Sequence, residues 1–257
     1  MPFTLAHPAA VVPLRRLAPL SALVIGSMVA DAGHFLSIDL PRGFTHGRRG
    51  LLMYSVPAGW LVWLIFQRLL REPLLALAPA GFAARLPAEA PLPRTFVEVG
   101  RITLGLVLGW LTHVAWDRMT TINFSLPYTA SLIAPLTVIR GVPIYPQDLL
   151  RHGSAMIALA LLALWLVRWW QRTPPAVRPT LILPITMRIS LIAVSSLAIA
   201  AFALAAASGH DSPFAGRTVL TRAVRAALPA IGVTVLGYAV IWQLWRRKSQ
   251  KLGSDTH

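Results

Sequence analysis

The sequence has 257 residues, of which 56% are hydrophobic and 13% are charged. Soluble domains carry about 25% charged residues, so this composition excludes an ordinary soluble protein and indicates an integral membrane protein. The absence of cysteine excludes disulfide bonds and thiolate metal sites. The net charge is +15, but the basic residues are spread between apolar segments and form no basic stripe, so we expect no nucleic-acid partner.

The N-terminal region holds two apolar segments of different length. Residues 8–16 form a short segment bounded by prolines that cannot cross a bilayer alone. The run at 17–36 is a weak candidate span, because two glycines, an aspartate and a histidine interrupt it. Arginines before this run and small residues at its end also fit a signal peptide. We expect the region to be retained, because residues 1–14 already form an apolar lead that signal peptides lack.

Five stronger apolar runs are long enough, or nearly so, to span about 30 Å of hydrocarbon. They lie near residues 51–67, 102–118, 153–168, 188–208 and 223–245. We therefore predict an all-α fold, a polytopic membrane helical bundle with five or six transmembrane helices. It forms a single transmembrane domain over 1–245, followed by a polar cytoplasmic tail at 246–257. The Pro- and Ala-rich stretch 72–95 predicts a surface loop with a short interfacial helix, and 119–150 predicts a long irregular loop.

The distribution of positive charge predicts the orientation. With six spans and a cytoplasmic N-terminus, the cytoplasmic segments hold 15 Lys and Arg residues and the opposite segments hold nine. This excess predicts that both termini are cytoplasmic. Arginine outnumbers lysine 22 to 2, which is typical of high-GC bacterial genomes, so the expected location is a bacterial inner membrane.

Two of the nine acidic residues, Asp31 and Asp117, lie within or at the margin of predicted spans. His34 lies three residues after Asp31 and His113 lies four residues before Asp117, so each pair shares one face of a helix. His46 follows in the loop GFTHGRRG. In the predicted topology all five lie toward the non-cytoplasmic side. Ionisable groups at this depth need partners, a water-filled cavity or a function.

Imidazole and carboxylate groups together suit Zn, Mn or Fe, and a divalent cation lowers the pKa of a bound water toward neutrality. A simpler alternative is that His113 and Asp117 hydrogen-bond each other as a clamp that holds the packed helices. The combination of the two pairs favours a divalent metal site, with zinc or manganese as the expected ion. Its ligand atoms should lie within about 4–5 Å of one another.

Two further histidines are weaker candidates. His7 precedes Pro8, and it reaches the face of Asp31 only if residues 8–16 fold back beside the next helix. Asp148 and His152 repeat the four-residue spacing, but outside the predicted bilayer, where a helix start or a solvated face is the simpler explanation.

Four segments carry a resemblance to a known family: MPFTLAHPAAVVPL, LSALVIGSMVADAGHF, GWLTHVAWDRMT and VPIY…LLRHGSAM. They resemble a bacterial membrane family catalogued as domain of unknown function 4184, most closely over residues 1–160. That family in turn resembles membrane-bound metal-dependent hydrolases. The resemblance implies metal ligands at His7, Asp31, His46, His113, Asp117 and His152. Their neighbours differ from the family pattern, so the resemblance implies metal binding more strongly than catalysis.

Three functions are compatible with these residues. The first is a metal-dependent hydrolase of a phosphoester or lipid-like substrate at the membrane surface, with His34 as acid/base. The second is a non-enzymatic membrane protein in which the His/Asp pairs are structural helix clamps. The third, a small transporter, is disfavoured because we see no internal repeat. The expected partners are the lipid bilayer and such a substrate, and the oligomeric state stays open.

Overall fold

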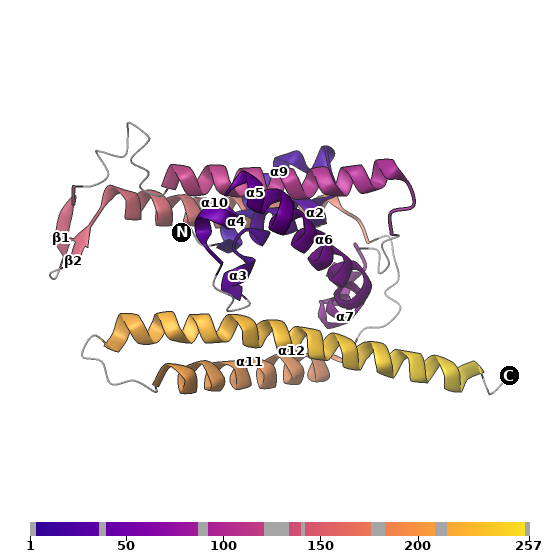
Figure 1. Cartoon of the computed structure of the whole chain (residues 1–257). Coiled ribbons are helices and arrows are strands. Elements are labelled where there is room, and N and C mark those ends of the chain that lie inside the picture. Colours follow the sequence, from indigo (N-terminus) through magenta and orange to yellow (C-terminus); the bar gives the residue numbers. More distant parts are fainter. Residues whose placement is uncertain are drawn as a thin grey trace. The chain divides into compact units, whose positions relative to one another are not determined.

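The structure is a computed structural model that describes residues 4–35, 40–86, 92–120, 134–139, 142–175, 183–208 and 215–254. It is almost wholly helical, which confirms the predicted all-α class (Figure 1). The chain divides into two compact units. Unit 1 comprises residues 1–31, 40–63 and 93–172, and unit 2 comprises residues 32–39, 64–92 and 173–257.

Among the described residues, five helices are long and apolar enough to cross a membrane, which agrees with the predicted five or six. They are Arg48–Leu77, Phe96–Thr120 (α9), Pro146–Arg172 (α10), Ile185–Ala206 within α11 (Ile185–Ser208), and Ala226–Lys248 within α12 (Ala215–Ser254). The weak candidate at 17–36 contains only a ten-residue helix, α2 (Leu20–Val29). Ten residues rise about 15 Å, half of a hydrocarbon core, so α2 does not cross by itself.

The first long helix is built of five consecutive pieces. They are α5 (Arg48–Gly50), the π-helical turn η3 (Leu51–Ser55), α6 (Val56–Ile65), a second π-helical turn η4 (Phe66–Leu70) and α7 (Arg71–Leu77). The division between the two units falls within α6. Helix α7 extends into the predicted surface loop at 72–95, which also contains the short helix α8 (Ala80–Ala83).

Helical residues occupy both ends of the predicted long loop at 119–150, because α9 reaches Thr120 and α10 begins at Pro146. Residues 121–133 lie outside the described part of the chain. The remainder contains a two-stranded antiparallel hairpin, β1 (Thr137–Ile139) and β2 (Val142–Ile144), which the sequence pattern did not predict. Helix α10 then begins at Pro146, where proline is favoured because its missing N–H would have no helical partner.

The N-terminal residues of unit 1 fold back against α2. They form three short helical turns, η1 (Thr4–Ala6), α1 (Pro8–Val11) and η2 (Val12–Arg16). Val11, Ala18 and Leu23 are buried together and hold this segment on α2. Residues 8–16 therefore fold back beside α2, which is the condition for His7 to reach the face of Asp31.

Helix α2 packs closely along α9 because glycine residues lie where the two helices meet. A Cβ on Gly109 would lie 2.3 Å from the carbonyl oxygen of Leu23, and a Cβ on Gly26 would lie 2.3 Å from that of Leu106. Gly105 and Gly109 are four residues apart, the small-xxx-small spacing that lets membrane helices approach closely. The tryptophans of α6 add hydrogen bonds, from Trp63 to Ser21 and from Trp60 to Thr103.

Unit 2 contains α3 (Ala32–Phe35), α7, α8, α11 and α12, of which α11 and α12 lie side by side (Figure 1). The hydroxyl of Tyr238 on α12 donates to the carbonyl oxygen of Pro73 on α7, and Arg246 pairs with Glu72. Most large side chains of α11 are apolar and exposed, as expected for a lipid-facing helix. Helix α12 continues to Ser254, so the predicted polar tail begins as helix.

The α2–α9 contact predicts a sharp difference between two Gly→Ala substitutions. Gly109→Ala should lower the free energy of unfolding by about 1–3 kcal/mol, because the new Cβ overlaps the backbone of α2. Gly153→Ala on α10 is the control, since its Cβ meets nothing within 4 Å, and it should be neutral or stabilising by up to about 1 kcal/mol. Unfolding of both variants in detergent measures the difference. Equal stability would contradict the proposed close contact.

Candidate metal centre

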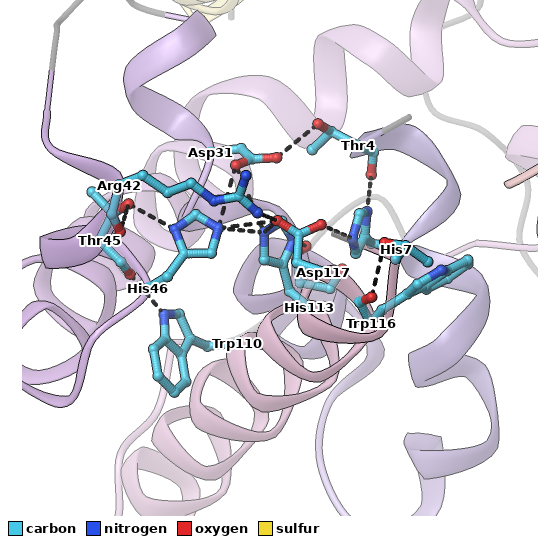
Figure 2. A network of polar contacts seen from close by, with 12 residues as sticks. Thr4, His7, Asp31, Arg42, Thr45, His46, Trp110, His113, Trp116 and Asp117 are labelled. Atoms are coloured by element: carbon cyan, nitrogen blue, oxygen red, sulfur yellow. Dashed lines mark hydrogen bonds and ion pairs between the residues drawn. The ribbon is translucent and has the colours of Figure 1, made fainter. Parts of the chain in front are cut away.

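Four predicted ligands from three segments meet in unit 1. Asp31 follows α2, His46 caps the C-terminal end of α4 (Arg42–Thr45), and His113 and Asp117 lie one turn apart on α9. Each offers one ligand atom, and these atoms all lie within 4.8 Å of one another. Figure 2 shows the four side chains pointing toward one another. The separation predicted for a metal site is therefore met.

The site lies where helices end. Asp117 is three residues from the end of α9, and His46 is two residues before the long helix that starts at Arg48. Asp31, His113 and Asp117 are almost completely buried, whereas His46 is partly exposed. The four groups thus form a buried polar cluster with one partly accessible member.

His46 and His113 both turn their Nε2 atoms toward the centre of the cluster. The Nδ1 of His113 lies 2.8 Å from the carbonyl oxygen of Ser27, and the Nδ1 of His46 lies 2.9 Å from the hydroxyl of Thr45. A carbonyl oxygen only accepts, so Nδ1 of neutral His113 carries the proton and its Nε2 presents a lone pair. The two Nε2 atoms are 3.2 Å apart. Hydrogen bonds of this kind orient metal-binding histidines, because they hold the ring with its second nitrogen free.

The two carboxylates complete the cluster. Oδ1 of Asp31 lies 3.7 Å from Nε2 of His113 and 3.8 Å from Nε2 of His46. Oδ2 of Asp117 lies 3.3 Å from Nε2 of His46 and 3.8 Å from Nε2 of His113. Tetrahedral zinc with bonds of about 2.0–2.1 Å places its ligand atoms about 3.3 Å apart, close to this spacing. A distance of 3.8 Å is too long for a hydrogen bond, so His113 and Asp117 do not form the simple clamp between themselves.

Arg42 is a member of the site that the sequence reasoning missed. Its guanidinium pairs with Oδ2 of Asp117, the oxygen that also faces the histidines. Its side chain is 41% exposed, so it links the buried carboxylate to the surface. The four-residue spacing of Arg42 and His46 was a usable signal, since it is the spacing of His113 and Asp117.

The N-terminal segment adds His7 and Thr4 to the same cluster. His7 is fully buried, and its ring stacks on that of His113 with centroids 4.2 Å apart. Its Nε2 lies 3.7 Å from Oδ1 of Asp117. The hydroxyl of Thr4, which the sequence reasoning did not select, donates to Oδ2 of Asp31.

The other two predicted site residues lie outside this arrangement. The side chain of His34, on α3, is outside the described part of the structure. His152 is exposed on α10 and is not one of the four residues whose ligand atoms cluster. Its assignment as a ligand remains a prediction.

Metal content of the purified protein provides the direct test of this site. We expect His113→Gln to lower the affinity for zinc or manganese at least tenfold, because it removes one of four ligands, whereas Asp148→Asn on α10 should bind as the wild type does. His152→Ala in the same series decides whether that histidine is a ligand. Metal content near zero in the wild type as well as in His113→Gln would reject a metal site.

A comparison with known proteins adds one match. No curated protein and no solved structure matches the chain. The sequence model of one family, described as Domain of unknown function (DUF4184), matches residues 1–247. This match covers every described residue of the cluster and nearly the whole chain, so the protein belongs to the DUF4184 family.

Proposed function

We propose that the protein holds a divalent cation, zinc or manganese, between Asp31, His46, His113 and Asp117. We further propose that it uses this cation to hydrolyse a phosphoester or a lipid-like substrate at the surface of a bacterial inner membrane. The observation that carries the proposal is the pair of Nε2 atoms that face each other at 3.2 Å beside two buried carboxylates.

Electrostatics favours a cation in this position. If both histidines carry their protons on Nδ1, two lone pairs and two carboxylate oxygens converge on one point and repel one another. Transferring one ionised Asp to the centre of a bilayer costs about 2.5–3.5 kcal/mol on insertion scales, and less toward the interface. Arg42 balances only one of the two carboxylates. A divalent cation would outweigh the remaining negative charge and turn the repulsions into bonds.

Hydrolysis is the reaction class that such a cation supports best. Bound zinc or manganese acidifies a water molecule toward neutral pKa and polarises a phosphoryl oxygen. Arg42 lies at the edge of the cluster with its guanidinium partly exposed, which suits the binding of an anionic group. His34 is kept as the acid/base on sequence grounds, three residues after Asp31.

Activity should depend on the cation and on the cluster. We expect the protein in detergent to hydrolyse bis-(4-nitrophenyl) phosphate, to lose this activity with a chelator and to regain it with zinc or manganese. His113→Ala with Asp117→Ala should abolish the reaction, His34→Gln should slow it at least tenfold, and Asp148→Asn should leave it unchanged. Vesicles of phosphatidylglycerol test a lipid substrate in the same way. A metal-loaded protein that cleaves neither probe would contradict the hydrolase assignment.

One observation favours a structural function instead. The pairing of Arg42 with Asp117 can hold α4 against α9 without any cation. In that case the cluster is a clamp between helices, and removal of Arg42 lowers stability because a buried charge loses its partner. The metal content of the wild type separates the two functions, since the clamp requires no metal.

The location of the termini is a separate proposal that follows from the distribution of arginines. We propose that the C-terminal tail is cytoplasmic, with both termini on that side. Two termini on one side require an even number of membrane crossings. Since the described residues hold five long helices, the region of α2 would have to form a sixth crossing. A phosphatase fused after Lys251 should be inactive in a bacterial host, and a fluorescent protein there should be bright. An active phosphatase would reverse the orientation, and fusions at the N-terminus test the sixth crossing.

A further inference from the structure

We infer that the cluster holds a second divalent cation, bound between Nε2 of His7 and Oδ1 of Asp117, so that the Asp117 carboxylate bridges two cations. This inference rests on the proposed function of the four-residue site. It deepens that function, because it assigns His7 to a cation of its own and indicates an anionic phosphoester as the substrate class.

The first observation is a pair of buried atoms without partners. Among the residues that the structure describes, neither Nε2 of His7 nor Oδ1 of Asp117 has a hydrogen-bond partner, and both atoms are inaccessible to solvent. They lie 3.7 Å apart, too far for a hydrogen bond between them. Buried polar atoms are nearly always satisfied, so two of them facing each other indicate a missing binding partner.

The second observation is that His7 is oriented as the two histidines of the first site are. Its Nδ1 lies 3.2 Å from the carbonyl oxygen of Thr4, which only accepts, so in the neutral ring Nε2 is the free nitrogen. The rings of His7 and His113 are stacked at 28°. Figure 2 shows both rings beside the carboxylate of Asp117. His113 approaches Oδ2 of this carboxylate, and His7 approaches Oδ1.

The geometry suits a bridged pair of cations. A cation with bonds of about 2.1 Å to both His7 and Asp117 fits a ligand separation of 3.7 Å at an angle of about 120°. His7 is not among the four residues whose ligand atoms cluster within 4.8 Å, so it belongs to a separate position. Two-cation hydrolytic sites place their ions about 3.5–4 Å apart, a distance that a bridging carboxylate spans.

The charge of such a centre indicates its substrate. Two carboxylates and one guanidinium leave the empty cluster negative, whereas two divalent cations make it positive. A phosphoester would offset part of this positive charge, and its oxygens could take the coordination positions that His7 and Asp117 leave open. Two cations acting together stabilise the attacking and the leaving oxygen of a phosphoryl group, which a single cation cannot do symmetrically.

The number of cations and their magnetic coupling test this inference. The full chain is purified in detergent, stripped with a chelator and loaded with manganese alone. We expect two Mn²⁺ per chain in the wild type and an electron paramagnetic resonance spectrum of a coupled pair. His7→Gln should bind one Mn²⁺, with the six-line spectrum of an isolated ion. Asp148→Asn, a substitution in the same unit but outside the cluster, should keep two.

The wild-type result decides the inference even if His7→Gln fails to fold. One uncoupled Mn²⁺ per chain, lost in His113→Gln, would overturn the second site and leave the first site standing. Two Mn²⁺ in folded His7→Gln would also overturn it, because His7 would then not be a ligand. A wild type that binds no Mn²⁺ or Zn²⁺ would overturn both this inference and the proposed function.

Discussion

The close contact between α2 and α9 is the constraint on which the candidate site depends. With glycine at positions 26, 105 and 109, the two helices approach so closely that an added Cβ at any of them would lie less than 3 Å from an atom of the opposite helix. Asp31 follows one of these helices, while His113 and Asp117 lie on the other. The same approach brings the carbonyl oxygen of Ser27 within 2.8 Å of the His113 ring. The packing of small residues thus sets both the separation of the candidate ligands and the orientation of one of them.

The position of the cluster explains how a membrane chain carries so many ionisable groups. The side chains lie near the ends of the helices. A charge costs less there than at the centre of a membrane helix. Two short elements, the N-terminal turns and α4, cover the cluster and supply His7, Thr4, Arg42 and His46.

Arg42 connects the structural and the chemical interpretations of the site. It pairs with the same Asp117 oxygen that faces the histidines, so it and a cation in the first position would compete for that oxygen. Binding of a cation would weaken this pair and leave a partly exposed guanidinium beside the metal. A group released in this way is well placed to bind the negative charge of a substrate. The same residue thus stabilises the cluster without metal and suits recognition of an anion with it.

The sequence alone determined the properties that follow from local periodicity. Long apolar runs predicted the membrane helices, because each run is long enough by itself to span the hydrocarbon core of a bilayer. The four-residue spacing of His113 and Asp117 predicted a shared helix face, and the penalty for a buried charge identified Asp31. Tertiary structure alone decided the rest. The length of α2, the roles of Arg42 and Thr4, and the nitrogen that each histidine turns inward depend on contacts between residues distant in the chain. No local pattern encodes such contacts, because packing of whole helices sets the distance between their side chains.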